Sequence, residues 1–330
     1  MNYRRLGAAG LKVSGIALGS WQSMGGCVVD RTAFAMMDRA WDLGVNLLDT
    51  ADIYQEGRAE ETIGRWMRGK AREEVLISTK CLRRMWAGPN GEGLSKKHIL
   101  VAAEKSLRRL GTDYIDIYQF HWPHPETPIE ESMEAMELLV RQGKVLYPGY
   151  SNYDIPDLVD AQKAARACRL RFASNQIRYT LFDRAFEQSL IPACGEEGLG
   201  ILVWSPLEQG LLTDAHLSGQ APAGSRLEAE DLAETLLTPA NLKAMAALAH
   251  IARARGATLA QLALAWLLRR PEVSSCIVGA YTPEELEEAC SAAQMTLAET
   301  ELRQIETILQ SREKTLGAKK GAEHESSSTS

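Results

Sequence analysis

The sequence lacks several features that define large functional classes. It has no apolar run near the roughly 20 residues that a membrane span needs. The longest apolar stretch, 257–268, is interrupted by Thr258 and Gln261. The first residues, MNYRRLG, hold no apolar core of the kind found in signal peptides, and no Asn-x-Ser/Thr sequence occurs. We therefore expect no membrane insertion and a cytoplasmic protein.

An excess of positive charge is also missing. Lys and Arg number 37 against 43 Asp and Glu, which gives a net charge of −6. Binding to a nucleic-acid backbone or to an anionic membrane surface depends on clustered cations. We therefore expect no nucleic-acid partner.

Cysteines are few, and none is arranged for a disulfide framework or a zinc site. The six cysteines are scattered singly, without a CxxC pair. Such frameworks belong to short secreted chains, so reduced thiols are expected. The pair His121 and His124 is separated by Pro123 and has no third ligand nearby, so no metal site is predicted.

Two common nucleotide-binding patterns are absent. There is no GxGxxG sequence, so a dinucleotide would not be held by a Rossmann turn, and no Tyr-x3-Lys pair occurs. Gly64-x4-Gly69-Lys70 has the outline of a phosphate loop. However, Ala71 stands where a Ser or Thr would hold Mg²⁺, and RWMRGK is typical of a helix end.

What is present is a repeated strand–helix pattern. With 45% apolar and 24% charged residues, the 330-residue chain can bury a substantial core. Short β-rich runs occupy 16–20, 45–50, 75–80, 114–121, 145–151, 172–177, 200–205 and 276–280. Amphipathic stretches between them include 31–43, 97–110, 130–142, 157–168 and 184–197. Eight such units favour an α/β fold of the (β/α)8 TIM barrel type over an open doubly wound sheet.

Additional segments flank the eight units. Tyr3–Leu6 and Leu11–Ser14 predict an N-terminal β-hairpin, and 298–311 predict a C-terminal extra helix. The irregular stretch 208–238 follows the seventh strand, where a barrel places ligand contacts. We expect one barrel domain over residues 1–311 and a disordered polar tail over 312–330.

Four polar residues are predicted to meet at the mouth of the barrel. Asp49, Lys80 and His121 end the second, third and fourth strands, and Tyr54 follows Asp49 by five residues. Each alone has a plain structural explanation, such as a helix cap, a packing residue or a solvated lysine. Together they permit proton donation to a carbonyl: a phenol of pKa about 10 next to a lysine cation, with a histidine to orient the oxygen. Without a metal or a nucleophile, such a set needs a hydride source, which points to a nicotinamide.

Sequence motifs around these residues resemble a known family. NLLDTADIYQEGRAEETIG, ISTK and YQFHWPHP resemble the active-site signatures of the aldo-keto reductases. LGSWQSMGG, VWSPLEQGLL and VSSCIVGAYTPEELEEA resemble the branch that contains the potassium-channel β subunits, and the resemblance covers almost the whole chain. It implies that Asp49, Tyr54, Lys80 and His121 form a catalytic tetrad. It also implies NAD(P)H-dependent reduction of aldehydes or ketones to alcohols, with Tyr54 as proton donor.

The resemblance also implies a cofactor site. Ser151, Asn152 and Gln176 would bind the nicotinamide carboxamide, and Trp204 would stack on the ring. The remaining implied contacts are Ser20, Trp21, Asp49, Ser205, Pro206, Leu207, Arg226, Gly279 and Glu288.

The adenosine end departs from the pattern of the family. Tyr281, Glu285 and Ala289 stand where that family usually has basic and polar partners for the 2′-phosphate of NADP, and Ala215 replaces a common Lys. An acidic residue repels a phosphate, whereas Arg226 would attract it. NADP(H) is favoured on the resemblance, and NAD(H) stays open.

An alternative function is a regulatory protein similar to the channel β subunits, which binds NADP(H) with little turnover. That subgroup often replaces the histidine, so His121 favours an enzyme. The expected partner is a small carbonyl compound, apolar or aromatic if Trp21, Trp86, Trp122 and the 208–238 segment line the pocket. The related branch often forms tetramers, so a homo-oligomer is possible.

Overall fold

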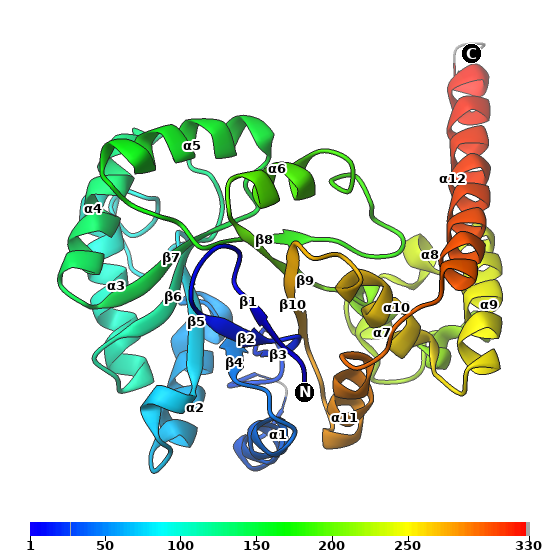
Figure 1. The fold of residues 1–330 in the computed structure, drawn as a ribbon, viewed down its shortest axis with the longest axis horizontal. Helices are drawn as coiled ribbons and strands as arrows, with labels where there is room; N and C mark the ends of the chain where they lie inside the picture. Colours follow the sequence, from blue (N-terminus) through cyan, green and yellow to red (C-terminus); the bar gives the residue numbers. More distant parts are fainter. Residues whose placement is uncertain (27, 328–330) are drawn as a thin grey trace.

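Eight parallel strands form a closed barrel, as the sequence predicts (Figure 1). The computed structural model describes residues 1–26 and 28–327, with side chains through Leu316. The barrel strands are β3 (Ile16–Gly19), β4 (Leu47–Asp49), β5 (Leu76–Cys81), β6 (Ile115–Phe120), β7 (Val145–Ser151), β8 (Ser174–Arg178), β9 (Gly200–Trp204) and β10 (Val273–Val278). They pair in chain order, and β10 closes the barrel against β3. Because all the strands are parallel, their carboxyl ends and the loops that follow meet at one mouth.

Helices surround the barrel and bury their apolar faces against it. They are α1 (Asp30–Asp42), α2 (Arg58–Met67), α3 (Lys96–Leu110), α4 (Ile129–Arg141), α5 (Ile155–Ala167), α6 (Leu190–Glu196), α9 (Pro239–Ala254), α10 (Leu259–Leu268) and α11 (Pro283–Ala292). Several begin at a side-chain cap. Ser95 caps α3, Asp154 caps α5, and Thr258 forms a capping box with Gln261 at the start of α10.

The helix predicted over 184–197 is wrong in its first half, because α6 begins only at Leu190. The preceding segment makes contacts that do not suit a regular helix. Thr180 accepts hydrogen bonds from the backbone of Phe182 and Asp183, which forms a local turn. Glu187 is buried and binds Arg269 and Arg270.

The N-terminal hairpin closes the end of the barrel opposite the loops. β1 (Tyr3–Arg5) and β2 (Lys12–Ser14) pair antiparallel, as predicted. In Figure 1 they lie across the front of the barrel. Beneath them a second apolar cluster consists of Leu6, Val13, Ala17, Leu47, Leu76, Ile117, Ala173, Leu202 and Ile277. Gly7 has a φ of +56°, and a Cβ there would lie 2.2 Å from the carbonyl oxygen of Gly198. The hairpin can therefore approach the barrel this closely only through a glycine.

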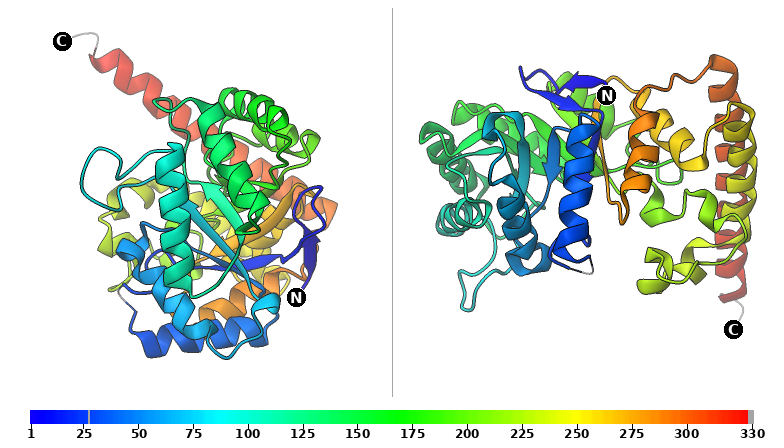
Figure 2. Two further views of the ribbon diagram at one scale, coloured as in Figure 1. Left: turned by 90° about the vertical axis from the view of Figure 1, so that its left-hand side faces the viewer. Right: turned by 90° about the horizontal axis from the view of Figure 1, so that it is seen from below.

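The segment after β9 and the last helix lie on the side of the molecule opposite α3 and α4 (Figure 1). The segment after β9 contains η3 (Glu208–Gly210), η4 (Asp214–His216), α7 (Arg226–Ala229) and α8 (Ala233–Leu236). The last helix, α12 (Glu299–Ser327), packs along α9 (Figure 2).

The structure differs from the predicted disordered tail over 312–330. α12 continues to Ser327, and Arg312 anchors its middle by donating hydrogen bonds to Asn241 Oδ1 (2.7 Å) and to the carbonyl of Phe182 (3.1 Å). Residues 328–330 lie outside the described part of the chain. Within that part, no helix is both long and apolar enough to span a bilayer. Five cysteines there are unpaired thiols, and Cys27 lies outside the described residues.

The helix that follows the second barrel strand, α2, is joined to α3 by a buried ion pair. Glu60 on α2 is fully buried and accepts a hydrogen bond from Thr79 Oγ1 (2.6 Å) and one from Arg109 Nε (2.7 Å). The two helices approach closely at Gly64, where a Cβ would lie 2.4 Å from the carbonyl oxygen of Arg109. Arg109 therefore supplies the charge that this buried carboxylate needs.

Arg109→Ala is expected to destabilise the protein by about 3 kcal/mol, because it leaves the Glu60 carboxylate buried without a cation. The free energy of unfolding in urea measures the effect. Arg108→Ala removes an exposed arginine from the same helix and is the matched control. Equal losses for the two variants would contradict the role assigned to the buried pair.

Candidate active site

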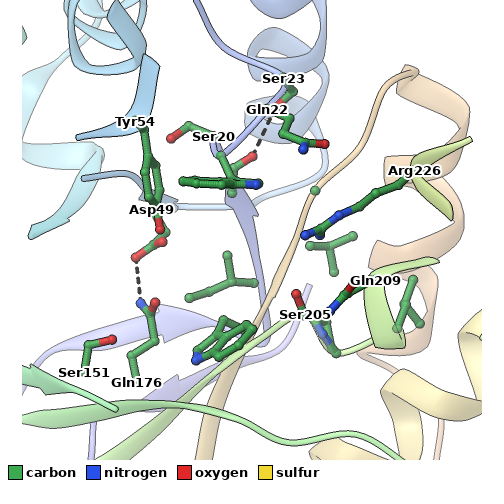
Figure 3. Close-up of a pocket in the computed structure, with 18 of the residues that line it drawn as sticks. Ser20, Gln22, Ser23, Asp49, Tyr54, Ser151, Gln176, Ser205, Gln209 and Arg226 are labelled. Carbon is green, nitrogen blue, oxygen red and sulfur yellow. Dashed lines mark hydrogen bonds between the residues drawn. The ribbon is translucent and has the colours of Figure 1, made fainter. Parts of the chain in front are cut away.

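A cavity of about 610 Å³ opens at the carboxyl ends of the barrel strands. Its walls come from the loops after β3, β4, β5, β6, β7, β9 and β10 and from the start of α7. Figure 3 shows Asp49 and Tyr54 at one end, with Arg226 and Gln209 at the other. The structure thus brings together residues that are as far apart in the sequence as Ser20 and Tyr281.

An ion pair between Asp49 and Lys80 lies at the floor of this cavity. Lys80 Nζ is 2.6 Å from Asp49 Oδ2 and also donates a hydrogen bond to the carbonyl of Thr50 (2.7 Å). The Lys80 side chain is completely buried. Burial alone would lower the pKa of Lys80, but the charge of Asp49 and the hydrogen bonds of the ammonium outweigh it, so this pKa is raised. Lys80 is therefore a fixed cation at neutral pH.

Three further polar side chains hold Asp49 in place. Its Oδ1 accepts a hydrogen bond from Ser78 Oγ (2.9 Å) and one from Gln176 Nε2 (2.8 Å), the second of which is drawn in Figure 3. Gln119 Nε2 donates in turn to Ser78 Oγ (2.7 Å). Ser78 and Gln119 were not predicted as site residues. Ser78 lies two residues before Lys80 and Gln119 two residues before His121, so alternation along the chain places them on the same face only once that register is known.

Tyr54 follows β4 in a tightly wound turn and points toward Lys80. Its Oη is 3.5 Å from Lys80 Nζ, and its ring packs edge-on against Trp21, with centroids 4.7 Å apart. The next residues, Gln55 and Glu56, both have φ values between +50° and +60°, an unfavourable backbone conformation for residues other than glycine. Burial raises the pKa of Tyr54, and the charge of Lys80 offsets this only in part. The phenol therefore keeps its proton at neutral pH.

His121 stands beside Tyr54 at the end of β6. The two ring centroids are 5.9 Å apart, and the backbone N–H of His121 donates to the carbonyl of Cys81 (3.0 Å). Burial, together with the nearby charges of Lys80 and Arg83, lowers the pKa of His121 well below its usual value. The imidazole is therefore neutral at physiological pH and able to donate one N–H hydrogen bond.

A connected set of side chains forms one wall of the cavity. Trp204 Nε1 donates to Asn152 Oδ1 (2.9 Å), and Asn152 Nδ2 donates to Ser151 Oγ (3.0 Å) and to the carbonyl of His121 (3.1 Å). Asn152 has a φ of +60°, which asparagine tolerates better than most residues. This amide therefore fixes the orientation of the Trp204 indole. All four predicted carboxamide and ring contacts, Ser151, Asn152, Gln176 and Trp204, line the cavity.

The rest of the cavity has features that fit an extended dinucleotide. Ser20 Oγ is buried, lines the cavity and has no hydrogen-bond partner among the described residues. Gly279 also lines it, and a Cβ there would meet nothing within 4 Å, so the glycine leaves an open cradle. The loop from Ser205 to Gln209 contains three residues with positive φ and is held by Glu208, which is bonded to Arg178 and Thr180.

At the far end, polar side chains join three segments across the cavity. Tyr281 Oη donates to Gln22 Oε1 (2.9 Å), and Gln22 in turn donates to Glu230. Arg226 Nε lies 3.1 Å from the same carboxylate of Glu230. Glu285 accepts a hydrogen bond from the backbone of Tyr281 (2.8 Å).

The structure separates some predicted residues from the cavity. Most implied cofactor contacts line it, including Trp21, Pro206, Leu207 and Arg226. Glu288 does not, and its carboxylate accepts a hydrogen bond from Thr258 Oγ1. Trp86 is also outside and stacks on His98, with ring centroids 4.7 Å apart. Gln209, from the 208–238 segment expected at the pocket, also lines the cavity. Gln22, Ser23 and Arg83 line it without having been predicted, because loop residues carry no periodic pattern that orients them.

Metal ligands are not gathered anywhere in the described residues. No group of three or more His, Cys, Asp or Glu side chains is placed to hold an ion there. The ring of His124 interacts with Thr127 Oγ1 at 2.8 Å instead.

Comparison with known proteins agrees with this geometry. Residues 15–310 match the model of the aldo/keto reductase family. A probable voltage-gated potassium channel subunit beta from Oryza sativa subsp. japonica is 37% identical over 327 residues, covering 95% of this chain and 98% of the relative. The L-glyceraldehyde 3-phosphate reductase of Escherichia coli (strain K12) is 36% identical over 318 residues, covering 93% of this chain and 92% of the relative. The chain therefore belongs to the aldo/keto reductase family.

Proposed function

We propose that this protein reduces aldehydes or ketones to alcohols with NADPH, and that Tyr54 is the proton donor. The observation that carries the proposal is the grouping of Tyr54, His121 and the Asp49–Lys80 pair at one end of a cavity of about 610 Å³. Reduction of a carbonyl adds a hydride at carbon and a proton at oxygen. A bound nicotinamide would supply the hydride, and the chain supplies the proton.

The protein groups divide the proton chemistry between them. Tyr54 holds its proton at neutral pH and sits beside a fixed cation, so negative charge that develops on the phenol oxygen during donation is stabilised by Lys80. Asp49 keeps that cation charged and in position. Neutral His121 donates a hydrogen bond to the substrate oxygen and orients it toward Tyr54.

The remaining contacts would hold the cofactor. Ser151 and Gln176, which line the cavity, would bind the carboxamide, and Trp204, held by Asn152, would stack on the ring. The loop from Ser205 to Leu207 would follow the pyrophosphate, and Ser20 has an unpartnered buried hydroxyl in the same cavity.

A second candidate function comes from the names of relatives. Two plant relatives and one from Schizosaccharomyces pombe are named as voltage-gated potassium channel β subunits, whereas the Escherichia coli relatives are named as reductases of a phosphorylated aldehyde. A regulatory protein could bind NADP(H) with little turnover. The grouping of His121 with Tyr54 and Lys80 favours the reductase.

Tyr54→Phe is expected to lower kcat for carbonyl reduction by about 10²–10⁴-fold, because the ring stays in place and only the donated proton is lost. Steady-state assays with a panel of aldehydes measure the loss. NADPH binding, followed by quenching of tryptophan fluorescence, should remain close to that of the unmodified protein. Retained turnover in this variant would falsify the assignment of Tyr54.

The pH profile of reduction should be flat from about pH 6 to pH 9. The reason is that the pKa of Tyr54 is raised above its usual value and the pKa of His121 is lowered well below its own. Neither group then changes its protonation in this range. Activity should fall only at higher pH, as Tyr54 loses its proton. A change of slope near pH 6.5 in single-turnover rates would contradict a neutral His121.

Preference for NADPH depends on Arg226. It is the cation at the far end of the cavity, but it already pairs with Glu230. A 2′-phosphate would have to compete with that carboxylate for the guanidinium. The resemblance to the family favours NADPH, and the acidic neighbour explains why NADH is a rival.

Glu230→Gln should strengthen NADPH binding by about three- to tenfold and leave NADH binding unchanged, because it frees Arg226 for the phosphate without changing side-chain size. Calorimetric dissociation constants for both cofactors measure the difference. Glu234→Gln, at an exposed residue of α8, is the control. An equal change for the two cofactors would show that Arg226 does not contact the 2′-phosphate.

A further inference from the structure

One charged side chain of the cavity has no role in the function proposed above. Arg83 lines the cavity together with Tyr54, His121 and Trp122. It comes two residues after Cys81, the last residue of β5, whose carbonyl accepts the backbone N–H of His121. Arg83 is near enough to His121 to contribute to the lowered pKa of that imidazole. The guanidinium therefore belongs to the end of the cavity where the substrate carbonyl would react.

The loop that carries Arg83 is held at its base, and the next arginine is used differently. The backbone N–H of Gly93 donates to the carbonyl of Leu82 (2.7 Å), so the two ends of the loop are joined next to Arg83. Arg84 forms an ion pair with Glu92 within the loop and does not line the cavity. Of the two adjacent arginines, Arg84 therefore stabilises the loop and Arg83 lines the cavity.

The charge of Arg83 is not balanced within the described residues. Asp49 is neutralised by Lys80, and Arg226 pairs with Glu230. Arg83 is the remaining charged residue in the cavity wall. Its side chain is exposed, and it makes no ion pair or hydrogen bond with the residues that the structure describes. An anion entering this end of the cavity would meet a free planar donor that can bind a carboxylate or a phosphate through two hydrogen bonds.

We infer that Arg83 binds an anionic group of the substrate, so that the preferred substrates are aldehydes or ketones that carry a carboxylate or a phosphate. The inference rests on the proposed function and adds the substrate class to it. Trp21 and Trp122, which are 48% and 38% exposed, line the same end and offer apolar surface to the part of the substrate between its carbonyl and its anion.

The test compares matched neutral and anionic substrates. 4-Carboxybenzaldehyde is paired with methyl 4-formylbenzoate, and glyceraldehyde 3-phosphate with glyceraldehyde. The unmodified protein should favour the anionic member of at least one pair by about tenfold or more in kcat/KM, as expected for a charge-assisted hydrogen bond. The pair with the larger ratio identifies the carboxylate or the phosphate as the anion.

Variants assign the preference to Arg83. Arg83→Ala should remove the preference, measured as a loss of kcat/KM for the anionic aldehyde that exceeds the loss for its neutral partner by about tenfold. Arg83→Lys should retain part of it. Arg84→Ala is the matched control and should keep the full preference. Equal kcat/KM values for the two members of each pair in the unmodified protein overturn the inference. A loss of preference in Arg84→Ala as large as that in Arg83→Ala also overturns it.

A binding measurement separates this inference from the proposed function. 4-(Hydroxymethyl)benzoate and its methyl ester are titrated calorimetrically into the protein saturated with NADPH. Tighter binding of the acid that is lost in Arg83→Ala supports the anion site even when no aldehyde is turned over, in which case only the proposed function fails. If neutral aldehydes are turned over but the acid and the ester bind equally well, the proposed function holds and the anion site at Arg83 is wrong.

Discussion

The ion pair between Asp49 and Lys80 is the constraint around which the centre of the molecule is organised. Removing two charges from water costs several kcal/mol for each ion, and their attraction compensates only when the geometry is good and the remaining donors and acceptors are bonded. Here the carbonyl of Thr50 and the side chains of Ser78 and Gln176 complete the shell. These residues come from β5, β8 and the end of β4, so the barrel must close before the pair is satisfied.

That requirement links the stability of the barrel to the properties of the site. The ammonium of Lys80 is neutralised by Asp49 and still lies within 3.5 Å of the Tyr54 hydroxyl. It is therefore available to stabilise negative charge on that oxygen and cannot move away into solvent. The loops adopt backbone conformations that strands do not: the turn after Tyr54 and the loop that begins at Ser205 both contain residues with positive φ. Such conformations persist only when neighbouring structure holds them, and they cluster where side chains must be placed accurately.

The sequence predicts the barrel and the position of the tetrad for the same physical reason. Buried parallel strands are continuous apolar runs, and a polar residue that ends such a run marks the mouth of the barrel. Asp49, Lys80 and His121 are visible in this way. Ser78 and Gln119 are not, because a polar side chain within an apolar run indicates an inward position only after the register is known. The first half of the predicted helix 184–197 fails because Glu187 forms tertiary ion pairs that local periodicity does not encode.

The two ends of the cavity differ in whether their arginine is already paired with a carboxylate. The strands position the buried Asp49–Lys80 pair, whereas Arg83 lies on a loop and Arg226 and Glu230 lie at the two ends of the short helix α7. At the far end the cation is already paired, so an incoming phosphate must displace a carboxylate and gains less than it would from a free arginine. At the near end the cation is exposed and unpaired among the described residues, so an incoming anion displaces only water from it. The balance of charge within the cavity is therefore set by segments outside the barrel strands, and the fold alone does not determine it.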